Sequence, residues 1–291
     1  MSDLFKCRHC LWYHAAGEPC PRQAEQNHEG GDDVSERQPL APQGSDEWLA
    51  ARVGKITASR FKDVLTEPRG KADREAGVLS DTATSYLYEI LGEQITGQAA
   101  PHYETAAMEW GHTWEPVARQ VYTDITGRAV RETGFLQHPT IAGVGCSPDG
   151  LVGDDGGCEI KCPYTAKEHL RTVLGGEIPK QYLAQVQGAM WITGRDWWDF
   201  ISYNPRFLST ADAFVCVRVA RDSKYIEHLH HACERFLARI GVALSTMAAV
   251  NTRMSEAHTA AHTAATEAPV EVDFSGIPTE DERLPHEKVG F

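Results

Sequence analysis

The chain has 291 residues, of which 42% are hydrophobic and 24% charged, and its formal net charge is -13. No apolar run approaches the roughly 20 residues of a membrane-spanning helix, and the first residues lack a basic segment followed by an apolar one. We therefore expect a soluble, cytoplasmic protein without a membrane partner. The acidic balance is unfavourable for a protein that binds nucleic acid, because phosphate contacts normally use Lys and Arg. It does not exclude one, since the chain ends carry much of the charge: residues 1–45 have 7 acids and 4 bases, and residues 246–291 have 8 and 3.

Four soft metal ligands lie close together near the N-terminus. They are Cys7, Cys10, His14 and Cys20. Their spacing is close to that of a zinc knuckle, and a chain without a secretion signal favours zinc over a disulfide. His9 or His28 could replace His14, and the alternative is a tail with reactive thiols. We predict a zinc-binding module over residues 1–20, with a role in DNA contact, partner contact or folding.

Residues 21–43 are rich in Glu, Gln, Gly, Asp and Pro and have no apolar period, which predicts a linker. The folded domain is expected over residues 44–245. Five further cysteines fall in its predicted strands and helices and are most simply small buried residues. They are Cys146, Cys158, Cys162, Cys216 and Cys233.

Residues 108–125 have apolar side chains at helical spacing, and Gly127 is placed to end the helix. This helix carries Glu115, which taken alone would be an ordinary surface glutamate.

Two short strands are predicted over residues 144–152 and 157–163, joined by the turn-rich residues 153–157. Side chains alternate along a strand, so Glu159 and Lys161 share a face, and Asp149 on the neighbouring strand can reach the same place. Two carboxylates form a hard oxygen site that suits Mg²⁺ or Mn²⁺ better than zinc. Lys161 could orient a water, stabilise charge on a phosphate, or act as a base if its pKa were lowered. A solvated hairpin with ordinary surface charges is the alternative.

The remaining elements extend this core. A helix over residues 180–192 carries Gln185, strands are predicted over residues 198–203 and 213–219, and an amphipathic helix over residues 226–240 is expected to pack on the core. Residues 246–291 are Ala/Thr/His-rich and then acidic, which predicts a disordered tail. Within it, residues 272–278 place apolar side chains among acids.

Four segments in this order resemble the lambda exonuclease family, also called the YqaJ-like viral recombinases. The resemblance runs from Gly44 to about Phe207. Its segments are residues 46–59, residues 109–115, the Ser-Pro-Asp-Gly and Glu-Ile-Lys-Cys-Pro stretches, and residues 182–191. It implies an α/β fold with a restriction-endonuclease-like core, in which helices flank a central mixed β-sheet. The small N-terminal Cys/His module and the disordered C-terminal tail lie outside it.

The resemblance also implies roles for individual residues. Asp149, Glu159 and the Ile160 carbonyl correspond to the metal ligands, and two Mg²⁺ ions are expected in each site, with Mn²⁺ as a substitute. The expected catalytic residues are Lys161, Glu115 and Gln185. Those expected to bind the terminal 5′-phosphate are Arg52, Ser59 and Ser147, which suits the bidentate guanidinium and the hydroxyl donors. Thr57 or Ser59 could instead only cap a helix.

The implied activity is a Mg²⁺-dependent 5′-to-3′ exonuclease on linear double-stranded DNA. It leaves 3′ single-stranded overhangs for homologous recombination of the phage type. The implied partners are double-stranded DNA ends, two further copies in a homotrimeric ring, and a single-strand annealing protein. The implied setting is a bacterial cell with a phage or prophage, and a ring could focus positive charge in its channel.

Two alternatives stay open. The first is a related endonuclease or single-strand nuclease, of the restriction or Cas4-like kind, some of which hold an iron–sulfur cluster. Such clusters generally use four cysteines, and only three lie near the N-terminus. The second is a non-catalytic module that binds DNA or a partner. The presence of all the expected catalytic side chains argues against it.

Overall fold

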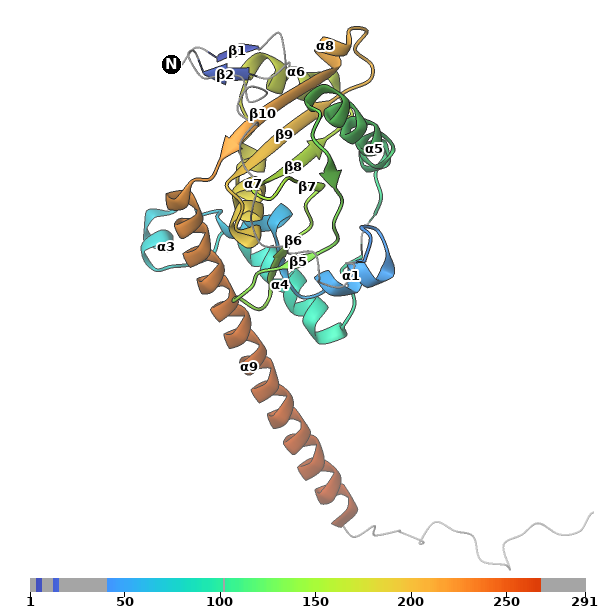
Figure 1. The fold of residues 1–291 in the computed structure, drawn as a ribbon. Coiled ribbons are helices and arrows are strands. Elements are labelled where there is room, and N and C mark those ends of the chain that lie inside the picture. The colour runs from blue at the N-terminus through green and yellow to red at the C-terminus, as the bar shows by residue number, and fades with distance from the viewer. Residues whose placement is uncertain (1–3, 7–12, 16–40, 102, 268–291) are drawn as a thin grey trace, which may run out of the picture. The chain divides into compact units, whose positions relative to one another are not determined.

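The computed structural model describes residues 4–6, 13–15, 41–101 and 103–267, with side chains for residues 41–101 and 103–260. The chain divides into two compact units, Met1–Val242 and Ala243–Phe291. The first unit contains the β-sheets and the helices that cover them (Figure 1).

The larger sheet has five strands in the order β10-β9-β8-β7-β4. Their bounds are Phe214–Ala220 (β10), Trp197–Tyr203 (β9), Gly156–Lys161 (β8), Gly150–Val152 (β7) and Val130–Arg131 (β4). Strands β8 and β9 are parallel and the other pairs antiparallel, so the sheet is mixed as predicted. The hairpin is confirmed as β7 and β8, and its turn contains Gly153 at φ 55°, a conformation that favours glycine.

A second sheet has three strands, β3 (Ile56–Thr57), β6 (Val144–Cys146) and β5 (Leu136–Gln137). The sequence predicted one strand over residues 144–152, and this is wrong. The chain leaves the second sheet after Cys146 and enters the first at Gly150, so residues 147–149 connect the two sheets. Pro148 explains the break, because proline has no N–H to donate to a strand partner.

Helices cover both faces of the larger sheet (Figure 1). Helix α5 (Ala106–Thr126) ends at Gly127, as predicted, and packs on β8 and β9. Helix α7 (Lys180–Thr193) also contacts β8 and β9, and its Tyr182 ring stacks on Phe200 of β9. The other helices before α9 are α1 (Asp46–Arg52), η2 (Ala58–Arg60), α2 (Phe61–Val64), α3 (Lys71–Glu75), α4 (Asp81–Thr96), α6 (Ala166–Gly175) and α8 (Thr210–Ala213).

The core between α5 and the larger sheet contains a buried charged network that the sequence did not predict. Asp199 on β9 is fully buried and accepts a hydrogen bond from the Tyr122 hydroxyl at 2.8 Å. The Arg218 guanidinium binds the same carboxylate through two hydrogen bonds of 2.9 and 3.0 Å. These bonds compensate the loss of solvent around the charge. The five predicted core cysteines are all buried with free thiols, as expected.

Helix α9 (Ser223–Glu267) corrects the predicted C-terminal boundary. Its first part packs on the core through buried Leu229, Phe236 and Ile240, as predicted. Residues 246–267 were predicted to be disordered, but they continue the helix, because Ala and Met favour helix and neither Gly nor Pro interrupts the segment. Residues 268–291 lie outside the described part. None of the described helices is both long and apolar enough to cross a membrane.

Strands β1 (Leu4–Lys6) and β2 (Tyr13–Ala15) pair antiparallel near the N-terminus. Three of the predicted zinc ligands, Cys7, Cys10 and Cys20, lie outside the described residues, as does the linker up to residue 40. His14 falls in β2, whose side chains are not described. The zinc module therefore stays a prediction.

Candidate active site

Strand β8 positions the two charged side chains at the centre of the site. Glu159 pairs with Phe200 and Lys161 with Ser202 in the register with β9, so the two side chains share a face, as predicted. The Glu159 side chain is 2% exposed, and its Oε1 lies 2.5 Å from the Lys161 Nζ. Lys161 thus partly neutralises a carboxylate that has almost no contact with solvent.

Asp149 reaches this pair from the connection between the two sheets. Its Oδ2 accepts a hydrogen bond of 2.6 Å from the backbone N–H of Ile160. The antiparallel pairing of Gly150 with Cys158 holds the two segments in this register. The hairpin therefore brings Asp149 beside β8, as the sequence predicted, and the Ile160 carbonyl remains a predicted ligand.

Two helices add further groups from opposite faces of the sheet. From α7, the Gln185 Nε2 donates a hydrogen bond of 2.6 Å to the Glu159 Oε1. From α5, Glu115 is coupled electrostatically to Asp149 and Lys161. Both residues are thus assembled with the strand residues, although neither would have been selected without the family resemblance.

Arg119, one turn after Glu115 on α5, is a site residue that sequence reasoning missed. Its Nη2 donates a hydrogen bond of 2.6 Å to the Glu115 Oε1, and its Nε donates one of 3.2 Å to the Asp149 carbonyl. A third contact runs from Nη1 to Glu132 at 3.1 Å. An acid and a base four residues apart on a helix are a known stabilising pair, and that spacing was the signal available in the sequence.

Burial and mutual repulsion shift the pKa values of the acids. Burial and the nearby Asp149 raise the pKa of Glu115 to about 7 and that of Glu159 to about 8. Burial also raises the pKa of Asp149. For Lys161, burial acts to lower the pKa, but Glu159 and Asp149 outweigh it and raise the pKa, so the side chain stays an ammonium.

The side chains fit a divalent cation bound through oxygen. Among the described residues, no group of three or more His, Cys, Asp and Glu side chains encloses a metal site by itself. Mg²⁺ does not need such a cage, because it usually keeps several waters and binds one or two carboxylates together with substrate phosphates. Asp149 and Glu159 supply these carboxylates. Burial raises the pKa of both, and Asp149 raises that of Glu159 further, so a bound divalent cation would stabilise the charged forms that this environment disfavours.

Two of the three predicted phosphate ligands lie together. The Arg52 Nη1 donates a hydrogen bond of 3.0 Å to the Ser147 Oγ. Trp48, a further residue that the sequence reasoning missed, donates its Nε1–H to the same oxygen at 2.9 Å and lies under the Arg52 guanidinium, 4.3 Å from ring centroid to carbon. Ser147 is two residues from Asp149, so the pair of Arg52 and Ser147 lies next to the candidate metal ligands Asp149 and Glu159.

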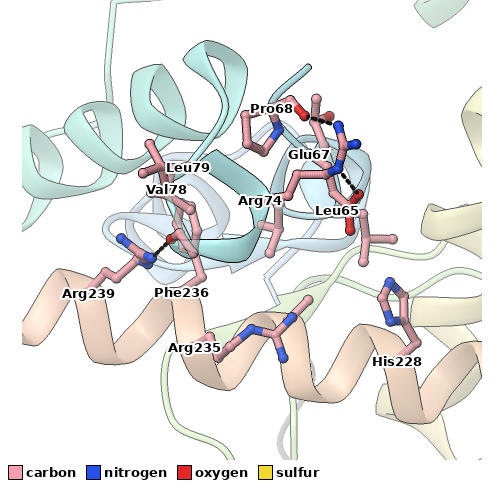
Figure 2. A pocket seen from close by; sticks show the side chains of 14 residues that line it. Leu65, Glu67, Pro68, Arg74, Val78, Leu79, His228, Arg235, Phe236 and Arg239 are labelled. Carbon is pink, nitrogen blue, oxygen red and sulfur yellow. Dashed lines mark hydrogen bonds and ion pairs between the residues drawn. The ribbon is translucent and has the colours of Figure 1, made fainter. Parts of the chain in front are cut away.

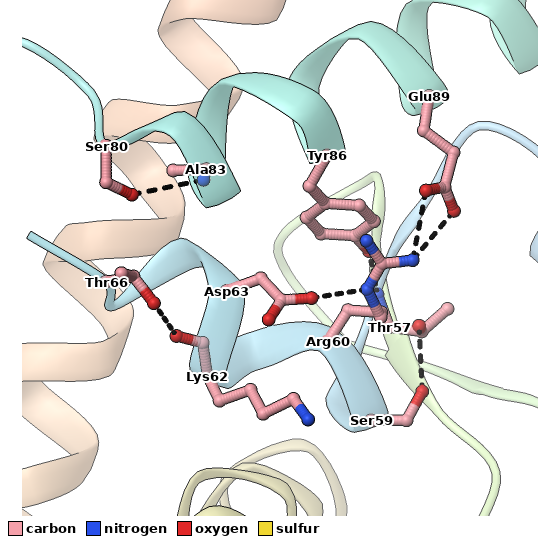
Figure 3. Close-up of polar contacts among 10 residues, drawn as sticks. All are labelled: Thr57, Ser59, Arg60, Lys62, Asp63, Thr66, Ser80, Ala83, Tyr86 and Glu89. Carbon is pink, nitrogen blue, oxygen red and sulfur yellow. Dashed lines mark hydrogen bonds and ion pairs between the residues drawn. The ribbon is translucent and has the colours of Figure 1, made fainter.

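Ser59 has a different neighbour in this structure. Its hydroxyl lies 3.3 Å from the Thr57 hydroxyl, at the start of η2 (Figure 3). Thr57 occupies the N-cap position but makes no side-chain capping bond, and Ser59 lies within the turn. The helix-capping alternative is therefore confirmed in position for Thr57, without the side-chain bond, and is wrong for Ser59. The phosphate role of Ser59 stays a prediction.

Comparison with solved structures identifies the class of protein. An alkaline exonuclease from Laribacter hongkongensis, LHK-Exo, is 37% identical, with a TM-score of 0.65 over 72% of this chain and 100% of that one. The same enzyme has been solved in complex with dAMP. A phage-related exonuclease from Haemophilus somnus 129PT shares the fold, with 20% identity and a TM-score of 0.54 over 66% of this chain and 96% of that one. The chain is thus a nuclease of the class that acts on DNA.

The sequence match defines the family. The YqaJ-like viral recombinase domain matches residues 47–196, and the chain belongs to that family. An uncharacterized protein of Escherichia coli (strain K12), ExoD, is 34% identical over 74 residues, which cover 25% of this chain and 83% of that protein. The resemblance found in the sequence is confirmed.

Proposed function

We propose that the protein is a Mg²⁺-dependent exonuclease that digests one strand of linear double-stranded DNA from its 5′ end and leaves a 3′ single-stranded overhang for strand annealing. The observation that carries this proposal is the convergence of Asp149, Glu159, Lys161 and Gln185 at β8, the middle strand of a mixed sheet. The similarity to LHK-Exo supports exonuclease chemistry rather than another use of these side chains.

Asp149 and Glu159, with the Ile160 carbonyl, would hold Mg²⁺ or Mn²⁺, and a second ion would share Asp149. When bound, the ions supply Lewis-acid stabilisation of the scissile phosphate and lower the pKa of a water. Glu115 and Arg119 border the same space on α5. Because Glu115 has a pKa of about 7 before metal binds, about half of these side chains carry a proton near neutral pH and lose it at higher pH.

Before metal binds, Lys161 is a cation, because Glu159 and Asp149 raise its pKa. Its ammonium lies 2.5 Å from Glu159, where it can donate to a phosphate oxygen that enters the site. Gln185 fixes the orientation of the Glu159 carboxylate by donating to one of its oxygens. Together these contacts leave little freedom for the side chain that would hold the metal.

The pair of Arg52 and Ser147 would anchor the terminal 5′-phosphate, with Ser59 as a third contact. The planar guanidinium suits bidentate binding of a phosphate. LHK-Exo has been solved in complex with dAMP, a nucleoside monophosphate, which supports a site for a nucleotide phosphate in this chain. Here the stack of Arg52 on Trp48 restricts the guanidinium before any DNA binds.

We also propose that the protein works as a homotrimer on DNA ends with a single-strand annealing protein, in the cytoplasm of a bacterial host cell and in a phage or prophage setting. A zinc ion held by Cys7, Cys10, His14 and Cys20 belongs to the same proposal. Family membership supports the first part, and only the Cys/His spacing supports the second.

The test uses linear duplex DNA with a 5′-phosphate on one strand and a different label on each strand, incubated with Mg²⁺ or with EDTA. The proposal expects Mg²⁺-dependent shortening of the phosphorylated strand alone, and no activity for Asp149→Ala or Lys161→Ala variants that keep the wild-type circular dichroism spectrum. Cleavage of closed circles would instead establish the endonuclease alternative. Absence of cleavage with both Mg²⁺ and Mn²⁺ would favour the non-catalytic binding module.

A further inference from the structure

An aromatic and cationic surface borders the candidate active site. Tyr164 is 45% exposed, and the guanidinium of the exposed Arg206 lies over its ring, 5.0 Å from the centroid. The same guanidinium lies 3.9 Å from the ring centroid of Trp110. The rings of Trp110 and Tyr164 meet edge to face, with their centroids 5.9 Å apart. These three side chains form the aromatic cluster.

Two separate elements connect the aromatic cluster to the catalytic groups. Tyr164 is three residues after Lys161, so their Cα atoms are no more than about 11 Å apart. On α5, Trp110 precedes Glu115 by five residues, which is about 7.5 Å along the helix. Successive phosphates of one strand are spaced about 3.4 Å along the axis of duplex DNA. The aromatic cluster therefore lies within about three nucleotides of a phosphate bound at the metal site.

The turn after β9 holds the aromatic cluster in place. The side-chain amide of Asn204 donates a hydrogen bond of 3.1 Å to the Pro163 carbonyl. The Arg206 guanidinium donates one to the Tyr164 carbonyl. From α5, Trp110 packs against the hydrophobic core. The Tyr164 ring is thus fixed through its backbone and by a neighbouring ring, while part of it stays open to solvent.

Exposed aromatic rings beside an arginine are the groups with which proteins bind unpaired nucleobases. Each base has a π-face that stacks on an aromatic ring, so such binding tolerates any sequence, and arginine adds cation–π attraction. A nuclease that digests one strand of a duplex separates that strand from its complement near the bond that it cuts. Unpaired bases are therefore present at the position of the aromatic cluster.

We propose that Tyr164, supported by Arg206, stacks on an unpaired nucleobase of the strand being digested, within about three nucleotides of the bond that is cut. This inference rests on the proposed function and adds a binding site to it. The stack keeps the strand from pairing again with its complement and holds the next phosphate near the metal site. The site is distinct from that of Arg52 and Ser147, which is proposed for the terminal phosphate.

Binding without cleavage tests the stack. A short single-stranded oligonucleotide carries the fluorescent base aminopurine, whose emission is quenched when it stacks, and is titrated with the full chain in EDTA and in Ca²⁺. Tyr164→Ala should weaken quenching and affinity about tenfold, whereas Tyr164→Phe should retain both. Tyr88→Ala, which removes a 66% exposed ring from α4, is the control and should bind as the wild type does. No quenching by the wild type in either condition, or equal binding by Tyr164→Ala and Tyr88→Ala, would overturn the proposal.

Duplexes with a single abasic nucleotide locate the base. We expect the wild type to be slowed most when the abasic nucleotide is at one particular position among the first four of the digested strand. Tyr164→Ala should cleave normal DNA more slowly than the wild type and lose this dependence on position. Retention of the dependence in Tyr164→Ala would refute the stack. Absence of all cleavage by the wild type would instead contradict the proposed function, and the binding experiment would still decide on the stack.

Matched arginine variants test the part of Arg206. Arg206→Ala should weaken oligonucleotide binding, because it removes both a cation and a bond that fixes Tyr164. The control is Arg235→Ala, since Arg235 is also exposed and lines a pocket of about 180 Å³ between the segment from α2 to α3 and α9 (Figure 2). In Figure 1, α3 and the start of α9 lie on the other side of the molecule from α5. Equal weakening by both variants would show only general attraction of DNA to positive charge and would refute the role of Arg206.

Discussion

Substitution of Arg119 tests whether this arginine keeps Glu115 ionised beside Asp149 and Glu159. It donates a hydrogen bond of 2.6 Å to Glu115, and both side chains are mostly buried, at 14% and 30% exposed. Hydrogen bonds to charged groups contribute about 1.5–3 kcal/mol, and one pKa unit corresponds to about 1.4 kcal/mol. Replacing Arg119 by Gln removes a charge that lowers the pKa of Glu115, so that pKa should rise further above about 7.

The assay is the initial rate of strand degradation at limiting Mg²⁺ between pH 6 and pH 9. If ionised Glu115 is required, activity of Arg119→Gln should fall about tenfold to a hundredfold at pH 6–7 and approach that of the wild type at pH 9. Glu132→Gln is the control, because Glu132 is 71% exposed, contacts the same arginine and raises the pKa of Glu115. Its profile should stay unchanged or move to lower pH. If activity depends on pH in the same way in both variants, Arg119 does not act by keeping Glu115 ionised.

Three further outcomes are expected. Arg52→Ala should reduce the preference for 5′-phosphorylated ends over hydroxyl ends at unchanged fold, measured by competition between the two substrates; an equal preference would remove Arg52 from the phosphate site. Asp199→Ala leaves the Arg218 charge and the Tyr122 hydroxyl without their partner and should lower the unfolding free energy by about 3–5 kcal/mol in urea titrations; a loss below 1 kcal/mol would contradict the buried network. Without metal, Glu115 and Glu159 have raised pKa values, so the unfolded state binds fewer protons than the folded state and the melting temperature should fall between about pH 4.5 and pH 8. Mg²⁺ should raise the melting temperature most at pH 8. A melting temperature that rises over this pH range without metal would disprove the assignment.

The sequence predicted the parts of the fold that depend on local pattern. Helical spacing and Gly127 defined α5, and strand alternation together with the glycine-rich turn defined the hairpin of β7 and β8. The break at Pro148 was missed because both sides of it are apolar and extended, which periodicity cannot separate into two sheets. The helix after residue 245 was not predicted, because a segment rich in Ala, Thr and His has no apolar period that separates a helix from a disordered tail.

The candidate site was predictable to a different extent for each residue. Glu159 and Lys161 followed from the alternation of side chains along a strand. The predicted hairpin placed Asp149 beside them, although Asp149 lies in the connection before β7 and not in a strand. Glu115 and Gln185 needed the family resemblance, since a single polar residue on a helix has no distinctive pattern. The Asp199 network could not be inferred, because its partners are 77 and 19 residues away in the chain and meet only through the tertiary fold.

The connection between the two sheets, residues 147–149, limits the distance between the proposed phosphate site and the proposed metal site. Ser147 and Asp149 are separated by a single residue, so their backbones can be no more than about 7 Å apart, whatever the surrounding side chains do. In the proposed reaction, one end of this span holds the terminal phosphate and the other faces the bond to be cut. The distance that the enzyme moves along DNA at each cleavage would then be set by the covalent geometry of these three residues. Substitutions elsewhere in the core would change the rate of cleavage but not this distance.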